Sequence, residues 1–300
     1  MDRTDFNPDE PLPGGAPQPG PGPIHRRHML HWLGGAGMFA LLTGCGDDGG
    51  DGGVTIPPTP TPTPTPTPVP PPTPTPPGPE PLCAETPPET SGDYPADGTN
   101  TAPGATSNVL TYAALQREDI RPSFIDTTTV AAGVQLSLTV TILDGTSCEP
   151  LSGRAVYIWQ ADAEGLFSLY TKPGESYLRG IGVTNADGEV SFTTIVPGCL
   201  EDRWPHIYVE VFPSLFVANK GSAADLVTQL IVPEAICAAA YADTDTYPDS
   251  AGNLDDVSIA EDPVFGDDST EENDARTLSV SGSASAGFVS TVAITLPADG

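Results

Sequence analysis

The chain has 300 residues and a formal net charge of −29, from 11 Lys and Arg against 40 Asp and Glu. A surface this acidic repels phosphate groups, which argues against nucleic acid and anionic membrane surfaces as direct partners. The composition divides the chain in two. Residues 1–82 are rich in proline and have little apolar pattern, whereas residues 83–300 carry regular short apolar runs and are long enough for a substantial core.

The first 44 residues are typical of an export signal. Arg26 and Arg27 precede an apolar run from Met29 to Leu42, which is too short to span a bilayer comfortably. The run ends in Leu-Thr-Gly before Cys45, which resembles a bacterial lipoprotein signal, and the Arg pair resembles a twin-arginine signal. We therefore expect a signal at 1–44, lipidation of Cys45 and anchoring at the bacterial cell envelope. An ordinary signal peptide or an uncleaved anchor are the alternatives.

Residues 45–82 are predicted to be a linker. They contain a Gly/Asp stretch at 46–53 and a Pro-Thr repeat at 57–77. Such repeats adopt extended polyproline II structure, so at about 3.1 Å per residue this one would reach roughly 60–65 Å. The sequence thus predicts a spacer before a domain at 83–300.

Cleavage before Cys45 would leave His206 as the only histidine, because the other three lie in the signal. It would also leave four cysteines: Cys83, Cys148, Cys199 and Cys237. An even number in an exported chain predicts two disulfides, with three possible pairings. Metal binding by these four is disfavoured, because no Cys-x-x-Cys spacing occurs.

Residues 83–300 are predicted to be all β. The segment 134–143 alternates strictly between apolar and polar residues, as a half-buried strand does. The segment 180–196 predicts a hairpin that turns at Asp187-Gly188. Further strands are expected at 154–160, 206–212, 225–232, 276–282 and 288–296. At least seven short strands and no helix pattern of useful length predict an antiparallel sandwich or barrel.

The strand at 206–212 is the main candidate for a functional site. Successive side chains of a strand point to opposite faces, so His206, Tyr208 and Glu210 share one face, and the alternating apolar residues share the other. The apolar face should meet a core. The polar face is then available for a metal, a ligand or water.

Several blocks of this domain resemble the intradiol ring-cleavage dioxygenases, in particular their exported, lipoprotein-like members. The blocks are CAETPPETSGDYPAD (83–97), LQREDIRPS (115–123), CEPLSGRAVYIWQADAEGLFSLY (148–170) and YLRGIGVTNADGEVSFTTIVPG (177–198). They follow one another in the order of the family. The resemblance implies an antiparallel β-sandwich of the intradiol dioxygenase type, and it implies enzymes that open catechols with a ferric ion held by two tyrosines and two histidines. A hard ferric ion suits phenolate oxygen, and imidazole completes such a site.

The resemblance places three substitutions at the four iron-ligand positions. The two tyrosine positions hold Phe167 and Leu200, the first histidine position holds His206, and the second holds Tyr208. The family arginine that stabilises developing negative charge corresponds to Arg203, the tentative catalytic residue. His206 and Tyr208 are the tentative metal ligands, and ferric iron is expected to be absent or weakly bound.

Other residues offer limited compensation for the lost ligands. Phenolate or carboxylate oxygens are available from Tyr170, Tyr177, Asp162, Glu164, Glu201 and Asp202. A lone histidine on a strand is, however, more often a hydrogen-bonded wall residue. Arg203 has a structural alternative as well, since it could pair with Glu201 or Asp202.

The remaining motifs are weaker. The acidic segments 243–256 and 261–274 do not have EF-hand spacing and are expected to be solvated loops. No Gly-x-Ser-x-Gly motif occurs for a hydrolase. The sequence therefore predicts an altered or catalytically inactive intradiol dioxygenase-family protein that binds a small aromatic or other small ligand. An active catechol-type dioxygenase with a non-standard metal site and a structural envelope module remain the alternatives.

Overall fold

The computed structural model describes residues 83–298. The predicted signal, lipidation site and linker, and with them Cys45, lie outside the described residues. In the part of the chain that the structure describes, no helix combines the length and the apolar character needed to cross a membrane.

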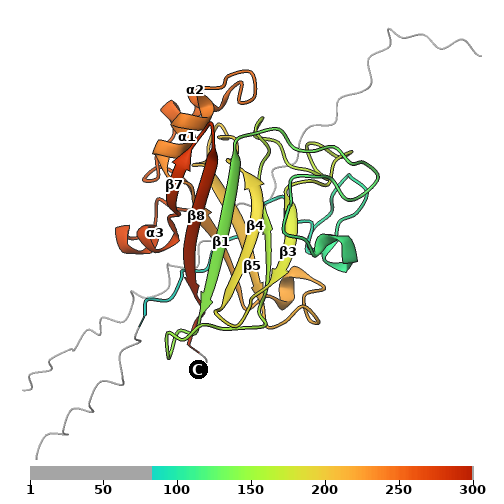
Figure 1. The fold of residues 1–300 in the computed structure, drawn as a ribbon, viewed down its shortest axis with the longest axis vertical. Helices are drawn as coiled ribbons and strands as arrows, with labels where there is room; N and C mark the ends of the chain where they lie inside the picture. The colour runs from blue at the N-terminus through green and yellow to red at the C-terminus, as the bar shows by residue number, and fades with distance from the viewer. Residues whose placement is uncertain (1–82, 299–300) are drawn as a thin grey trace, which may run out of the picture. The chain divides into compact units, whose positions relative to one another are not determined.

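Eight strands form two four-stranded sheets (Figure 1). The strands are β1 (Gln135–Leu143), β2 (Ala155–Trp159), β3 (Arg179–Val183), β4 (Glu189–Ile195), β5 (His206–Phe212), β6 (Leu226–Ile231), β7 (Ser279–Ser283) and β8 (Gly287–Thr295). The first sheet has the order β4-β1-β8-β7 and the second β3-β2-β5-β6. The predicted sandwich is confirmed, and each of the eight strands lies in a segment where the sequence predicts one, although the strand expected at 276–282 begins at Ser279.

Two features of the pairing differ from the expectation. β1 and β8 pair in parallel, whereas all other pairs are antiparallel. The predicted hairpin at 180–196 is wrong, because β3 pairs with β2 and β4 pairs with β1 in the other sheet. The turn itself forms: Gly188 has φ +72°, and the Asn185 side chain accepts hydrogen bonds from the amides of Asp187 and Glu189. Local turn residues reverse the chain, but they do not select the partner strand.

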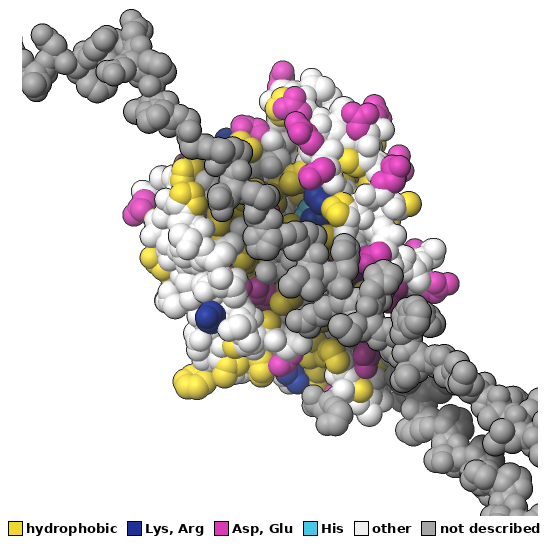
Figure 2. Space-filling model, turned by 180° about the vertical axis from the view of Figure 1, so that it is seen from behind, with side chains coloured by type: hydrophobic (Ala, Val, Ile, Leu, Met, Phe, Trp, Pro, Cys, Tyr) yellow, Lys and Arg dark blue, Asp and Glu magenta, His cyan; other side chains and the backbone are white. Residues whose placement is uncertain are grey.

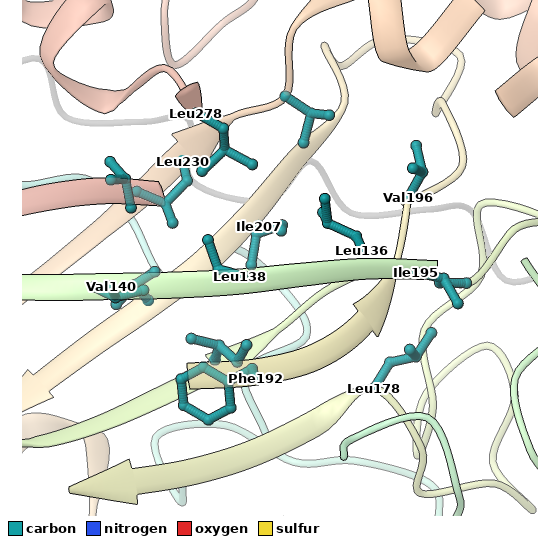
Figure 3. Packing of buried hydrophobic residues seen from close by; sticks show 14 of the residues in the cluster. Leu136, Leu138, Val140, Leu178, Phe192, Ile195, Val196, Ile207, Leu230 and Leu278 are labelled. Carbon is teal, nitrogen blue, oxygen red and sulfur yellow. The ribbon is translucent and has the colours of Figure 1, made fainter. Parts of the chain in front are cut away.

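The main core lies between the sheets. β1, β4 and β8 contribute alternating apolar residues from one sheet, and β2, β5 and β6 contribute the facing side chains from the other (Figure 3). Leu136, Leu138 and Val140 are fully buried in this cluster, as the alternation predicts. Apolar burial of this kind stabilises the fold by about 25 cal/mol per Å² removed from water.

Three short helices interrupt the predicted all-β pattern. They are α1 (Glu234–Tyr241), α2 (Ser250–Asp256) and α3 (Thr270–Arg276), and they lie beside β7 and β8 at one edge of the molecule (Figure 1). Each has seven or eight residues, so the helical period had little length in which to show. α2 and α3 occupy much of the two acidic segments that were expected to be loops.

A second buried cluster lies on the other face of the β3-β2-β5-β6 sheet. Its strand residues include Tyr157, Trp159 and Tyr208, and Phe167 packs with them from the β2–β3 connection. Residues 86–97, which we call the strap, run across this face without forming a strand of their own. The strap bonds to β6 through Glu89 N–H to Val227 O (2.7 Å) and accepts from the Gln229 amide at Thr90 O (2.8 Å).

Candidate functional site

The two faces of β5 separate as the alternation predicts. Ile207, Val209 and Val211 enter the core between the sheets. Tyr208 belongs to the second cluster on the opposite face, and Tyr208 and Glu210 both lie on the side that the strap covers. All seven strand residues are buried, so the polar face meets protein rather than bulk solvent.

Tyr208 is held in an aromatic stack. Its ring lies parallel to that of Trp159, its register partner on β2, with centroids 4.9 Å apart and an interplanar angle of 3°. Phe167 meets the ring edge-on at 6.2 Å. Gly92 of the strap lies against it, and a Cβ at that position would stand 2.7 Å from the phenol oxygen. Burial raises the pKa of Tyr208, although nearby Arg203 opposes the shift. Tyr208 is therefore a packed, protonated phenol.

His206 has one partnered and one unpartnered ring nitrogen. Nδ1 lies 2.6 Å from Trp204 O, which fixes the proton on Nδ1 because a carbonyl can only accept. Nε2 is buried and has no hydrogen-bond partner. Burial lowers the pKa of His206 to about 3, and the positive charge of Arg203 adds to this. His206 is thus a neutral imidazole with one free lone pair.

The Arg203 guanidinium is hydrogen-bonded to two other side chains of the domain. Its Nε lies 3.0 and 3.2 Å from the two oxygens of Asp262, and Nη2 donates to Gln229 Oε1 at 2.7 Å. Asp262 also accepts from the amides of Trp204, Val264 and Phe265. Asp262 therefore takes the place of the expected partners Glu201 and Asp202. Nothing in the sequence around 262 marks it, since the contact spans about sixty residues.

Phe167 and Leu200, which the resemblance sets at the two tyrosine positions of the family, pack in the same cluster as Tyr208. Phe167 is 1% exposed and packs against Tyr94 at a centroid distance of 4.5 Å. Leu200 is half-buried and packs against the same cluster. It also lines a surface cavity of about 680 Å³. Five carboxylates line that cavity: Glu164, Glu201, Asp202, Asp249 and Asp256.

Four of the six oxygen donors considered as replacement ligands have other partners. Tyr170 OH donates to Asn100 Oδ1 at 2.6 Å. Tyr177 OH donates to Asp162 Oδ2 at 2.8 Å. Glu164 forms an ion pair with Lys172 at 2.8 Å. The structure therefore does not bring these oxygens together with His206, and within residues 83–298 no three His, Cys, Asp or Glu side chains gather into a metal-binding group.

Glu210 is a buried acid that the alternation pattern placed on this face without assigning it a role. It is fully buried, and neither oxygen has a hydrogen-bond donor. Burial raises its pKa to about 9, and the neighbouring carboxylate of Asp97 in the strap adds to the shift. Glu210 is therefore protonated at neutral pH and lies beside an acceptor on Asp97.

The residues present do not fit the ferric centre of the family. Phe167 and Leu200 have no donor atom, and Tyr208 is a protonated phenol enclosed by Trp159, Phe167 and Gly92. Of the four positions that the resemblance assigns to iron ligands, only that of His206 holds the expected type of donor, the lone pair on Nε2. One donor in place of four cannot replace the hydration of a hard trivalent ion.

The cysteines form one of the two predicted disulfides. Cys83 is bonded to Cys148. Cys199 and Cys237 are buried thiols, and burial raises the pKa of each to about 12. The even count therefore predicted one bond too many for this structure.

The fold and one segment of the sequence match known dioxygenases. Residues 107–208, about a third of the chain, match a family model described as "Dioxygenase". The chain is similar to the intradiol ring-cleavage dioxygenase from Tetranychus urticae, with a TM-score of 0.52, 20% identity, and coverage of 71% of this chain and 94% of that one.

A second similar structure is the dioxygenase domain of a carbohydrate-binding fusion protein from Streptomyces sp. SirexAA-E, with a TM-score of 0.44, 22% identity, and coverage of 72% and 100%. No curated protein matches the chain. The family model thus matches the middle third of the chain, and the Tetranychus urticae structure shares its fold.

Proposed function

We propose that this chain is a member of the intradiol ring-cleavage dioxygenase family that has lost ferric ring cleavage. The observation that carries the proposal is the content of the iron-ligand positions: Phe167, Leu200 and a stacked Tyr208 beside a single imidazole, His206. Arg203, the tentative catalytic arginine, is neutralised by Asp262 instead of facing a reacting anion. Each substitution removes a different part of the family chemistry.

The retained function that we propose is binding of a small molecule. The cavity beside Leu200 has a volume of about 680 Å³, which lies within the usual range of about 300–1,000 Å³ for ligand pockets. Leu166 and Leu200 supply apolar contact, and the acidic side chains around them supply hydrogen-bond acceptors. This combination suits a small aromatic or polyhydroxylated molecule that donates hydrogen bonds.

We also propose that the protein is exported and lipid-anchored through Cys45. The support is the signal-like sequence before Cys45 together with the Cys83–Cys148 disulfide, since structural disulfides persist in oxidising compartments. Metabolic labelling with a palmitate analogue tests the anchor. A protein labelled at Cys45 supports it, and labelling that survives Cys45→Ser contradicts it.

Iron loading of the purified full chain tests the loss of ring cleavage. We expect less than about 0.1 equivalent of ferric ion after incubation and desalting, no visible phenolate-to-iron absorption band, and no consumption of catechol. Stoichiometric iron with catechol turnover would overturn the proposal and favour an active dioxygenase with a non-standard metal site.

The matched control restores the family ligands. In the variant Phe167→Tyr, Leu200→Tyr, Tyr208→His, iron binding should appear if the backbone of the site keeps the family geometry. Thermal unfolding of this variant must first show that it is folded. A folded variant that takes up no iron would show that the backbone of the site does not keep the family geometry, and it would favour the structural envelope module.

A further inference from the structure

The outer face of the β4-β1-β8-β7 sheet is made of short, uncharged side chains. Strand residues alternate between the two faces of a sheet, so the residues between the core-facing ones of β1, β4 and β8 point outward. The strand register sets them in two adjacent rows: Thr193, Ser137, Val289 and Ser281, then Ser191, Thr139, Thr291 and Ser279. All of them except Val289 carry a hydroxyl group. We call these two rows the hydroxyl face.

The hydroxyl face is open to solvent. Ser191 and Thr291 are exposed, and Ser137 and Thr139 on the central strand are half-buried. Val289 is 55% exposed, although it is apolar. In Figure 1 this sheet faces the viewer, and none of the three α-helices lies across β1 and β8. The face is therefore available to a partner.

The neutrality of this face contrasts with the charge of the whole chain. The net charge is −29, yet residues 127–143 and 277–298, which supply β1, β7 and β8, contain no charged residue. Charges lie only at the β4 margin of the face, on Glu189 and on the ion pair of Asp119 with Arg121. Acidic side chains are numerous on the opposite side of the molecule (Figure 2). Two copies of so acidic a chain can therefore approach through the hydroxyl face without setting acid against acid.

Hydroxyl groups also make the face complementary to a copy of itself. A hydroxyl both donates and accepts hydrogen bonds, whereas a carboxylate only accepts and an ammonium group only donates. Thr139 Oγ1 and Ser191 Oγ, which lie 3.0 Å apart, form such a pair within the face. Short side chains also lose little rotamer freedom when they are covered. A two-fold dimer requires this property, because both copies contribute the same patch.

The area of the face sets the strength of such a contact. Neighbouring strands lie about 4.8 Å apart and residues rise about 3.4 Å along a strand, so the sheet measures roughly 19 Å by 25 Å. Two copies would bury about 1,000 Å² in total, which is the lower limit for a specific interface. The area therefore suits a weak, reversible dimer.

We propose that two copies of this chain associate through their hydroxyl faces, related by a two-fold axis, as a weak and reversible dimer. The exposed Val289 supplies an apolar contact within the interface. The contact itself is neutral, but the two bodies that it joins are both strongly negative and repel each other. Salt screens that repulsion and therefore strengthens the dimer, whereas salt would weaken an interface built on ion pairs.

Sedimentation velocity of the purified full chain tests the dimer. The chain is compared over about 5–500 μM protein, at about 0.02 M and about 0.5 M NaCl. We expect the sedimentation coefficient to rise with concentration toward that of a dimer, and the dissociation constant to be about tenfold or more lower at the higher salt concentration. A chain that stays monomeric over the whole range would overturn the proposal and leave the face to a different partner. A dimer that salt weakens would overturn it as well.

Three variants assign the association to the hydroxyl face. Thr291→Glu places an acid in the middle of the face of each copy and should raise the dissociation constant about tenfold or more. Thr101→Glu is the matched control, because it adds the same charge at an exposed position next to Ala102, which packs on the outer side of the other sheet. It should leave the dissociation constant within about twofold.

The third variant, Val289→Ser, removes the apolar contact without adding a charge and should raise the dissociation constant about threefold or more. It decides the test if Thr291→Glu does not fold, and circular dichroism checks the fold of each variant. Association that the two face variants leave unchanged would come from another part of the chain, and the proposal would then be wrong. Equal effects of Thr291→Glu and Thr101→Glu would also contradict it, because general repulsion would explain both.

Discussion

Close packing around one side chain, that of Tyr208, determines the geometry of the candidate site. The ring of Tyr208 fills the space between Trp159 and Phe167. Gly92 makes this possible, because its φ of +62° suits glycine and its missing side chain leaves room for the phenol. Tyr208 and Gly92 are thus complementary, although they are distant in the sequence.

We predict that Gly92→Ala destabilises the domain. The added Cβ would stand 2.7 Å from the Tyr208 oxygen, and alanine is strained at this φ, so the free energy of unfolding should fall by about 1–3 kcal/mol. Urea denaturation followed by tryptophan fluorescence measures the change. Gly174→Ala is the matched control, since Gly174 is exposed and a Cβ there meets nothing within 4 Å. Equal losses in both variants would contradict the packing argument.

The sequence predicted which residues lie at the candidate site, but it did not predict what their side chains contact. Alternation along 206–212 was sufficient to place Tyr208 and Glu210 on one face, because the period of a strand is a local property. The partners of Arg203 and Glu210 were not predictable, since Asp262 and Asp97 lie at long sequence separations. The family resemblance supplied the ligand positions, but it could not show that Gly92 lies against Tyr208.

At the scale of elements, the start of β5 is fixed by a loop from far along the chain. The Asp262 carboxylate accepts hydrogen bonds from the Arg203 side chain and from the amides of Trp204, Val264 and Phe265. It therefore joins the segment before β5 to the segment before α3. Its side chain is fully buried. Buried carboxylates with several donors act as structural anchors, and their loss leaves those donors without a partner.

We predict that Asp262→Asn lowers the free energy of unfolding by about 3 kcal/mol, because it leaves the buried Arg203 without its counter-charge. Chemical denaturation measures this loss. Asp267→Asn removes one exposed carboxylate from the same loop and should change stability by less than about 0.5 kcal/mol. If the two variants had similar effects, general charge reduction would explain the result and the anchor would not.

Strand positions were predictable, and strand partners were not. The alternating pattern located the strands, including β1 and β5 to within one residue. The β3–β4 turn has sound local chemistry at Asn185 and Gly188, yet the two strands enter different sheets. Pairing depends on which faces are buried together, and this is a property of the assembled sandwich.

For the whole molecule, acidity and covalent linkage are the main features. Asp and Glu side chains surround the face seen in Figure 2, with few Lys or Arg among them. Such a surface favours solubility and repels anionic partners. The N-terminal segment of the domain is attached to it by hydrogen bonds and by the Cys83–Cys148 bond, the only disulfide in residues 83–298.

We predict that Cys83→Ala with Cys148→Ala lowers the free energy of unfolding by about 4 kcal/mol, because the bond closes a long loop with a sequence separation of 65. Guanidinium denaturation with and without reductant measures the effect. Reductant should destabilise the wild type to a similar extent and leave the double variant unchanged, since Cys199 and Cys237 are already thiols. A variant that is still weakened by reductant would contradict this assignment.

The position of that bond has a mechanical consequence. Cys83 lies three residues before the strap begins, and its disulfide joins it to Cys148 in the β1–β2 connection. Tension applied through the preceding chain would therefore pass through the sulfur atoms into the sandwich and would bypass residues 86–97. Load on the preceding chain would therefore not act on the hydrogen bonds that hold residues 86–97 against the β3-β2-β5-β6 sheet.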